Sequence, residues 1–364
     1  MWSFLRRSEE KRKAGVRALL GRLCAGSFAR LGAVMMAVLM LLGTMSLLSG
    51  CRRGFGKDAV GKVKVVVTIY PMYDFVRRIG GDRVAVIMMV PAGTEPHAWE
   101  PSTRDMLMLE EADVFVYNGA GMEAWAEDIL GSVQNKDLLI VEACHDVELI
   151  RMEEIDDDHD HDGHDEDHDE DHDHENHEDH GEDEHGHHHH GEFDPHVWLS
   201  PKNAEIEMKS IAEALIQADP EHADTYKKNL EAAKNECAAL DSAFREELGK
   251  YEGGCIVVAH EAYGYLCKEY GITQIGIEGV SADQEPDAAR MREIIDMVEE
   301  YGIKCIFFEE LVDPKVAETI AAETGCRTQA LSPLDGLSQD DIEAGRDYFS
   351  VMKDNLAAIV ASFE

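Results

Sequence analysis

Short runs of apolar and β-branched residues alternate with amphipathic helical segments along this chain, and no other feature restricts the possible folds as much. The predicted strands span residues 62–69, 84–90, 113–118 and 138–142 in the first half, and 255–259, 272–277, 305–309 and 327–331 in the second. Alternation of this kind produces parallel sheets with helices on both faces. We therefore predict an α/β protein with two parallel-sheet lobes.

A long amphipathic helix is predicted between the two halves, over residues 221–248, with apolar side chains at steps of three or four. At 1.5 Å per residue it would be about 42 Å long, which is comparable to the width of a small domain. We expect it to join the lobes, and a second long helix over residues 340–362 to close the chain. The predicted domains are a signal peptide over residues 1–50, a first lobe over 51–218, the linking helix over 219–249 and a second lobe over 250–364.

One segment of the first lobe, residues 153–193, is rich in histidine and in acidic residues. It contains 21 carboxylates and no Lys or Arg, and 13 of the 18 histidines of the chain lie between His159 and His190. Such a segment has too little apolar surface to offset the entropy of ordering it, so we predict a disordered loop. Imidazole is a good ligand for zinc, copper and nickel, and carboxylates concentrate divalent cations. The segment therefore indicates metal binding, with a solvated acidic linker as the alternative.

The N-terminal residues have the pattern of a secretory signal. Eight basic residues precede or flank the start of an apolar run over residues 31–48, and the sequence Leu48-Ser49-Gly50-Cys51 follows. This sequence resembles a bacterial lipobox, so we expect Cys51 to be lipidated and to hold the mature protein on the outer side of the cell membrane. A membrane-spanning helix over the same run is the alternative. The long basic leader also leaves open a start codon downstream of Met1.

Charge and cysteine content exclude other classes of function. The formal net charge is −40, and a chain this acidic repels phosphate backbones, which argues against nucleic-acid binding. The cysteines after Cys51 form no CxxC pair, so a thiolate zinc site is not expected. One disulfide among the last four cysteines suits an oxidising compartment, with buried free thiols as the alternative. These four are Cys255, Cys267, Cys305 and Cys326.

Four candidate metal ligands lie at the ends of predicted strands or directly after the acidic segment. They are His97, His196, His260 and Asp335. Because ligands bind outside the carboxyl ends of parallel strands, and because two candidates come from each half, we expect a site in the cleft between the lobes. Three imidazoles and one carboxylate form a closed tetrahedral set that holds Zn²⁺ without activating water. Manganese prefers more oxygen ligands. Glu95 is the alternative fourth ligand.

The residues around these candidates resemble the metal-ligand motifs of the metal-specific solute-binding proteins of ABC transporters. Residues 91–101 (PAGTEPHAWEP), 194–201 (DPHVWLSP) and 259–265 (AHEAYGY) are similar to the first three motifs in order. Residues 331–337 (LSPLDGL) are similar to the fourth, where several members have Glu and some zinc members use water or a nearby Glu. The resemblance covers about residues 62–362. Members of the zinc branch have His at the third position and a His/acid-rich loop, so His260 implies zinc.

The resemblance implies an extracytoplasmic, monomeric zinc-binding component of an ABC importer, which delivers Zn²⁺ to a membrane permease driven by a cytoplasmic ATPase. Such a protein is not an enzyme. A zinc-storage or surface-adhesin lipoprotein is one alternative, and binding of nickel, copper or manganese is another. A zinc hydrolase with Glu261 or Glu95 as general base is the third.

Overall fold

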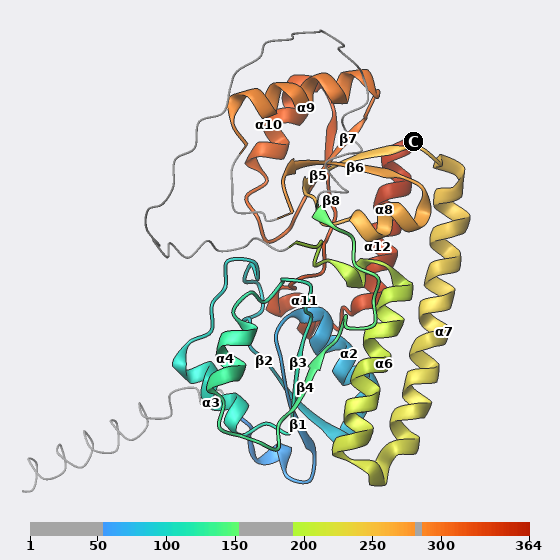
Figure 1. Ribbon diagram of the computed structural model, residues 1–364. Coiled ribbons are helices and arrows are strands. Elements are labelled where there is room, and N and C mark those ends of the chain that lie inside the picture. Colours follow the sequence, from blue (N-terminus) through green and yellow to red (C-terminus); the bar gives the residue numbers. More distant parts are fainter. Residues whose placement is uncertain (1–53, 153–191, 281–285) are drawn as a thin grey trace, which may run out of the picture. The chain divides into compact units, whose positions relative to one another are not determined.

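The computed structural model describes residues 54–152, 192–280 and 286–364, and the described residues from Phe55 onward form one compact unit (Figure 1). The predictions for the signal peptide, the lipidated Cys51 and the histidine-rich loop lie outside the described residues. In the described ranges, no helix is both long and apolar enough to cross a membrane. The six described cysteines, from Cys144 to Cys326, are free thiols.

Two four-stranded parallel sheets form the core of the fold, which confirms the predicted α/β class. The strands are β1 (Val63–Val67), β2 (Val84–Met88), β3 (Val114–Tyr117), β4 (Leu139–Glu142), β5 (Cys255–His260), β6 (Thr273–Glu278), β7 (Cys305–Phe308) and β8 (Arg327–Ala330). The strand orders are β2-β1-β3-β4 and β6-β5-β7-β8, so both halves have the same topology. The first strand of each half, β1 or β5, is an inner strand, and its carboxyl end therefore lies between those of its two neighbouring strands.

Helices cover both faces of each sheet. They are α2 (Tyr70–Gly80), α3 (Thr103–Glu110), α4 (Ala126–Ser132), α6 (Pro201–Ala218), α7 (Ala223–Leu248), α8 (Gly264–Tyr270), α9 (Ala288–Glu300), α10 (Lys315–Thr324), α11 (Gln339–Glu343) and α12 (Tyr348–Phe363). Short 3-10 turns lie at Lys57–Ala59, Gly81–Arg83, Val197–Leu199, Pro220–His222 and Gly249–Tyr251.

The inner strands are buried on both faces, as their largely apolar sequences predict. In β1, Val65 and Val67 point into the main hydrophobic core, while Val66 packs on the opposite face with side chains from α3. In β5, Val258 joins the same main core and Val257 packs under α9 and α10. One hydrophobic cluster therefore includes side chains from both sheets.

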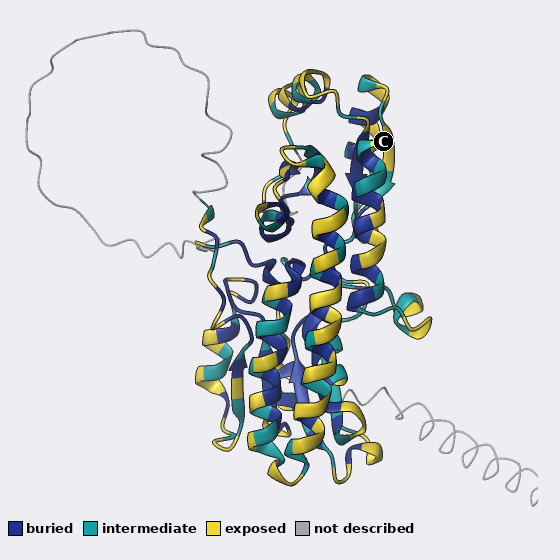
Figure 2. Cartoon of the chain, turned by 90° about the vertical axis from the view of Figure 1, so that its right-hand side faces the viewer, coloured by how far each residue is buried: buried dark blue, intermediate teal, exposed yellow. Residues whose placement is uncertain are grey.

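Helix α7 joins the two halves, as predicted. It has 26 residues and packs against α2 and α6 of the first half and against α8 and α12 of the second. The apolar stripe of α7 is buried and its opposite face is exposed (Figure 2). Its buried side chains are Tyr226, Ala233, Cys237, Leu240, Phe244 and Leu248. The residue boundaries of the lobes stay a prediction.

The single closing helix predicted over residues 340–362 is wrong, because the chain breaks between α11 and α12. Gly345 has a φ of +81°, which a side-chain-bearing residue rarely adopts. Asp347 then caps α12, since its carboxylate accepts a hydrogen bond from the backbone N of Ser350. The break turns Tyr348 towards the first half, where its hydroxyl donates to the carbonyl of Trp198 at 2.7 Å.

Candidate metal centre

The four predicted ligand side chains meet at the carboxyl ends of the strands. Each offers one ligand atom, and these atoms all lie within 4.8 Å of one another. His97 lies on the loop after β2, His196 directly precedes the turn Val197–Leu199, His260 ends β5, and Asp335 lies between β8 and α11. His97 is partly exposed and the other three side chains are buried. The structure therefore brings together the four side chains that the sequence singled out, and their role as ligands stays a prediction.

The three imidazoles point the same ring nitrogen at a common centre. Nε2 of His196 lies 3.1 Å from Nε2 of His97 and 3.2 Å from Nε2 of His260. Two nitrogens bound to one tetrahedral zinc ion at its usual bond length would be about 3.3 Å apart. The spacing of the three nitrogens therefore fits a single small cation among them.

Two buried carboxylates hold the rings in this orientation. Oδ1 of Asp194 lies 2.9 Å from Nδ1 of His196, and Oε1 of Glu309 lies 2.5 Å from Nδ1 of His260. A carboxylate that accepts from Nδ1 leaves the lone pair of Nε2 free for a metal. Asp194 also accepts from the backbone N of His196 at 2.9 Å, which fixes the turn.

Neither carboxylate was assigned a role in the sequence analysis. Asp194 was visible as part of the motif that contains His196. Glu309 follows the end of β7, which is the kind of position that singled out His260. A search for acidic residues at every strand end would have found Glu309, although its partner is 49 residues away in the sequence.

Burial and neighbouring charge shift the pKa values of the three histidines in different directions. Burial, and then the neighbouring imidazoles, lower the pKa values of His97 and His196 well below the usual value. Burial also acts to lower the pKa of His260, but the charge and hydrogen bond of Glu309 outweigh it and raise that pKa to about 9. Two imidazoles are therefore neutral and ready to bind a cation, and the third must first release a proton.

Asp335 supplies an oxygen to the cluster. Its Oδ1 accepts from the backbone N of Gly336 at 2.8 Å, whereas its Oδ2 is buried and has no hydrogen-bond partner among the described residues. Burial, and then the charges of Glu95 and Glu309, raise the pKa of Asp335 well above its usual value. An unpartnered buried carboxylate oxygen is unfavourable unless a cation or a donor meets it. The preceding residue, Leu334, is fully buried with a φ of +62°.

Glu95, the alternative fourth ligand, has a different environment. Its Oε1 accepts from the backbone N of His97 at 2.9 Å, so one carboxylate oxygen is already used to shape the loop. Glu95 does not belong to the group of four residues whose ligand atoms lie together. The geometry therefore favours Asp335 over Glu95 as the oxygen donor.

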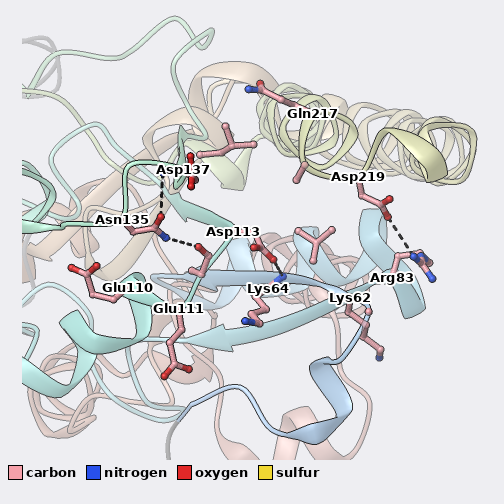
Figure 3. Close-up of a pocket in the computed structure, with 15 residues that line it drawn as sticks. Lys62, Lys64, Arg83, Glu110, Glu111, Asp113, Asn135, Asp137, Gln217 and Asp219 are labelled. Carbon is pink, nitrogen blue, oxygen red and sulfur yellow. Dashed lines mark hydrogen bonds and ion pairs between the residues drawn. The ribbon is translucent and has the colours of Figure 1, made fainter.

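A larger cavity, of about 700 Å³, lies at the amino ends of β1, β3 and β4 and contains none of the candidate ligands (Figure 3). Several of its polar side chains already have partners in the protein. Asp113 accepts from the backbone N of Lys64 at 2.8 Å, and Arg83 lies 3.6 Å from Asp219. The cavity is at the opposite end of the strands from the histidines, so the metal centre is the better candidate site.

Two parallel sheets with a buried three-histidine, one-carboxylate cluster at their carboxyl ends define a metal-binding protein of the two-lobed α/β class. The chain belongs to the family described as "ZnuA: Zinc-uptake complex component A periplasmic", whose model matches residues 65–362. This confirms the resemblance found in the sequence. The family is a component of a transport system.

Individual relatives agree with this assignment. The chain is 40% identical over 308 residues to the zinc-binding protein AdcA of Streptococcus pyogenes serotype M3, covering 83% of this chain and 56% of the relative. It is 37% identical over 307 residues to the high-affinity zinc uptake system protein ZnuA of Bacillus subtilis, covering 84% of this chain and 89% of that protein. The chain thus spans little more than half the length of the AdcA relative.

A solved structure has the same fold. The Zn(II)-bound ZnuA-like domain of Streptococcus pneumoniae AdcA matches with a TM-score of 0.66 and 33% sequence identity. The match covers 83% of this chain and 99% of that domain.

Proposed function

We propose that this protein binds Zn²⁺ outside the cytoplasm through His97, His196, His260 and Asp335, and delivers it to the permease of an ABC importer. The observation that carries the proposal is the convergence of three imidazole Nε2 atoms with a carboxylate oxygen of Asp335, a buried side chain whose Oδ2 has no hydrogen-bond partner among the described residues. Membership of a zinc-uptake family and the zinc named for AdcA and ZnuA support the choice of ion.

The ligand set explains why the ion is bound and not used for chemistry. Three nitrogens and one carboxylate oxygen complete a tetrahedral zinc site and leave no open position for a reactive water. Zinc accepts such a nitrogen-rich set, whereas manganese prefers oxygen. The protein is therefore a carrier and not an enzyme. A lipid on Cys51 holds the monomer beside the permease, which a cytoplasmic ATPase drives.

Metal analysis and competitive titration of the mature chain from Arg52 onward test this proposal. We expect one tightly bound zinc per chain, and its loss when His97, His196 and His260 are all changed to Ala. His145→Ala is the matched control, because His145 is exposed and outside the cluster. Tight binding that survives the triple change would contradict the proposed site.

The transport role has its own test. A strain without this protein should fail to grow in medium with a zinc chelator, and added zinc should restore growth. Growth equal to that of the parent strain would instead support a storage or adhesin role.

A further inference from the structure

A second cavity, of about 260 Å³, adjoins the cluster of proposed ligands on the side of Asp335 and Glu309. The residues that follow β7 and those between β8 and the start of α11 form its walls. They are Glu309, Glu310, Leu311, Ser332, Pro333, Asp335, Gly336, Leu337, Ser338 and Asp341. Four of these residues are acidic and none is basic. The cavity therefore has a negative potential that would attract a cation.

The acidic residues extend from the buried cluster to the surface. Asp335 and Glu309 are 3% and 4% exposed, and Glu310, the next residue along the chain, is exposed. Asp335, whose Oδ2 has no hydrogen-bond partner among the described residues, belongs to the inner wall. Asp341 has partners of its own, since its carboxylate accepts from the hydroxyl of Ser338 and lies 3.7 Å from Arg346. Glu310 is therefore the exposed carboxylate available to an incoming ion.

We propose that this acidic cavity is the passage through which the divalent cation travels between solvent and the imidazole cluster, and that Glu310 is the carboxylate it meets first. The inference rests on the proposed zinc site. Carboxylates along the passage replace part of the hydration shell before the imidazoles are reached. They also raise the local cation concentration, which increases the association rate.

The alternative route for the cation is from the side of His97, which is the partly exposed member of the cluster. Glu95, on the same loop as His97, already uses one carboxylate oxygen to accept from the backbone N of His97. On the acidic side, a Cβ at Gly336 would lie 3.0 Å from Cδ1 of Leu311, so Leu311 packs closely against this wall. A larger side chain at position 311 would narrow the cavity, and Leu311 is not one of the four proposed ligands.

Stopped-flow zinc binding to the mature chain, with a fluorescent chelator as competitor, tests the role of Glu310. Glu310→Gln should lower the association rate about two- to fivefold at low ionic strength, and the difference should vanish at high salt. Glu318→Gln is the matched control, because Glu318 is exposed on α10 and does not line the cavity. Identical rates for Glu310→Gln and the control would count against the proposal.

A pair of bulky variants tests the passage itself. Leu311→Trp should slow association and dissociation by the same factor, at least about fivefold, because it raises a barrier and leaves the bound state unchanged. Ala98→Trp, beside His97, should leave both rates unaltered. The opposite pattern would place the passage at His97 and overturn the inference. A wild-type chain without a tight zinc site would overturn the proposed function instead, before any rates were compared.

Discussion

Glu309 controls the protonation of His260, one of the proposed metal ligands. With the pKa of His260 raised to about 9, its Nε2 is protonated at neutral pH and the proton has to leave as zinc enters. The apparent zinc affinity of the wild type should therefore rise with pH from 7 towards 9. It should change by up to about tenfold per pH unit for each proton released.

Glu309→Gln removes the charge that raises this pKa. We expect the variant to release fewer protons on binding zinc at pH 7.5, and its affinity to depend less on pH above 7. Calorimetric titration in buffers of different ionisation enthalpy measures the number of protons. The zinc affinity at pH 9 should still fall about tenfold or more, because the orientation of His260 is weakened. Equal proton release by wild type and variant would contradict this role of Glu309.

The identity of the oxygen ligand can be decided with two conservative substitutions. Asp335→Asn should lower zinc affinity at least about thirtyfold, because removing one charge from a buried pair costs about 2 kcal/mol or more. Glu95→Gln should change affinity only a few-fold, since Glu95 mainly accepts from the backbone of His97. Competition with a chelator of known affinity measures both. A larger loss for Glu95→Gln would make Glu95 the ligand.

Among the helices, Arg78 of α2 connects three elements. Its guanidinium lies 2.7 Å from Asp347 at the start of α12 and 3.0 Å from Glu236 of α7, and it stacks 4.4 Å from the ring centre of Phe349. Arg78→Met should lower the free energy of unfolding by about 1–2 kcal/mol, because partly exposed ion pairs and cation–π contacts are each worth about 1 kcal/mol or less. Lys227→Met on the exposed face of α7 is the control in denaturant titrations.

The same contact predicts how the effect of Arg78 depends on pH. Burial acts to raise the pKa of Asp347, but the hydrogen bonds of Ser350 and the charge of Arg78 outweigh it and lower that pKa. The stability from Asp347 is therefore present at neutral pH and is lost as the pH falls through the lowered pKa. The difference between wild type and Arg78→Met should shrink in strong acid. A constant difference down to pH 2 would show that packing, and not charge, explains it.

The elements that could be predicted from sequence are those with local signals. The β-branched strands and the apolar stripe of α7 can each be recognised from a short stretch of sequence. The same is true of the three histidines, each of which lies in a short motif. The break between α11 and α12 was not predicted, because apolar residues occur on both sides of it and suggest one continuous helix. The residues that mark the break are Gly345, with its positive φ, and Asp347, which caps α12. The pairing of Glu309 with His260 depends on how β5 and β7 align in the sheet, which no local pattern contains.

At the scale of the whole molecule, the ends of the histidine-rich segment lie side by side. Arg151 and Phe193 form an antiparallel bridge, and the backbone N of Met152 donates to the carbonyl of Glu192 at 3.1 Å. Replacing residues 156–191 by a short Gly-Ser linker should therefore leave the unfolding free energy and the tight zinc site unchanged. It should remove several weak zinc equivalents, counted by equilibrium dialysis. Loss of the tight site would show that the segment contributes a ligand.

The hydrophobic cluster shared by the two sheets has a mechanical consequence. Since Val65 of β1 and Val258 of β5 belong to the same core, moving the halves far apart would expose apolar surface to water. The two halves of the described part of the chain should therefore move as one rigid body and should not open and close relative to each other. In the proposed transport cycle, the ion would then leave by stepwise ligand exchange with the permease, at a rate that local side-chain motion limits.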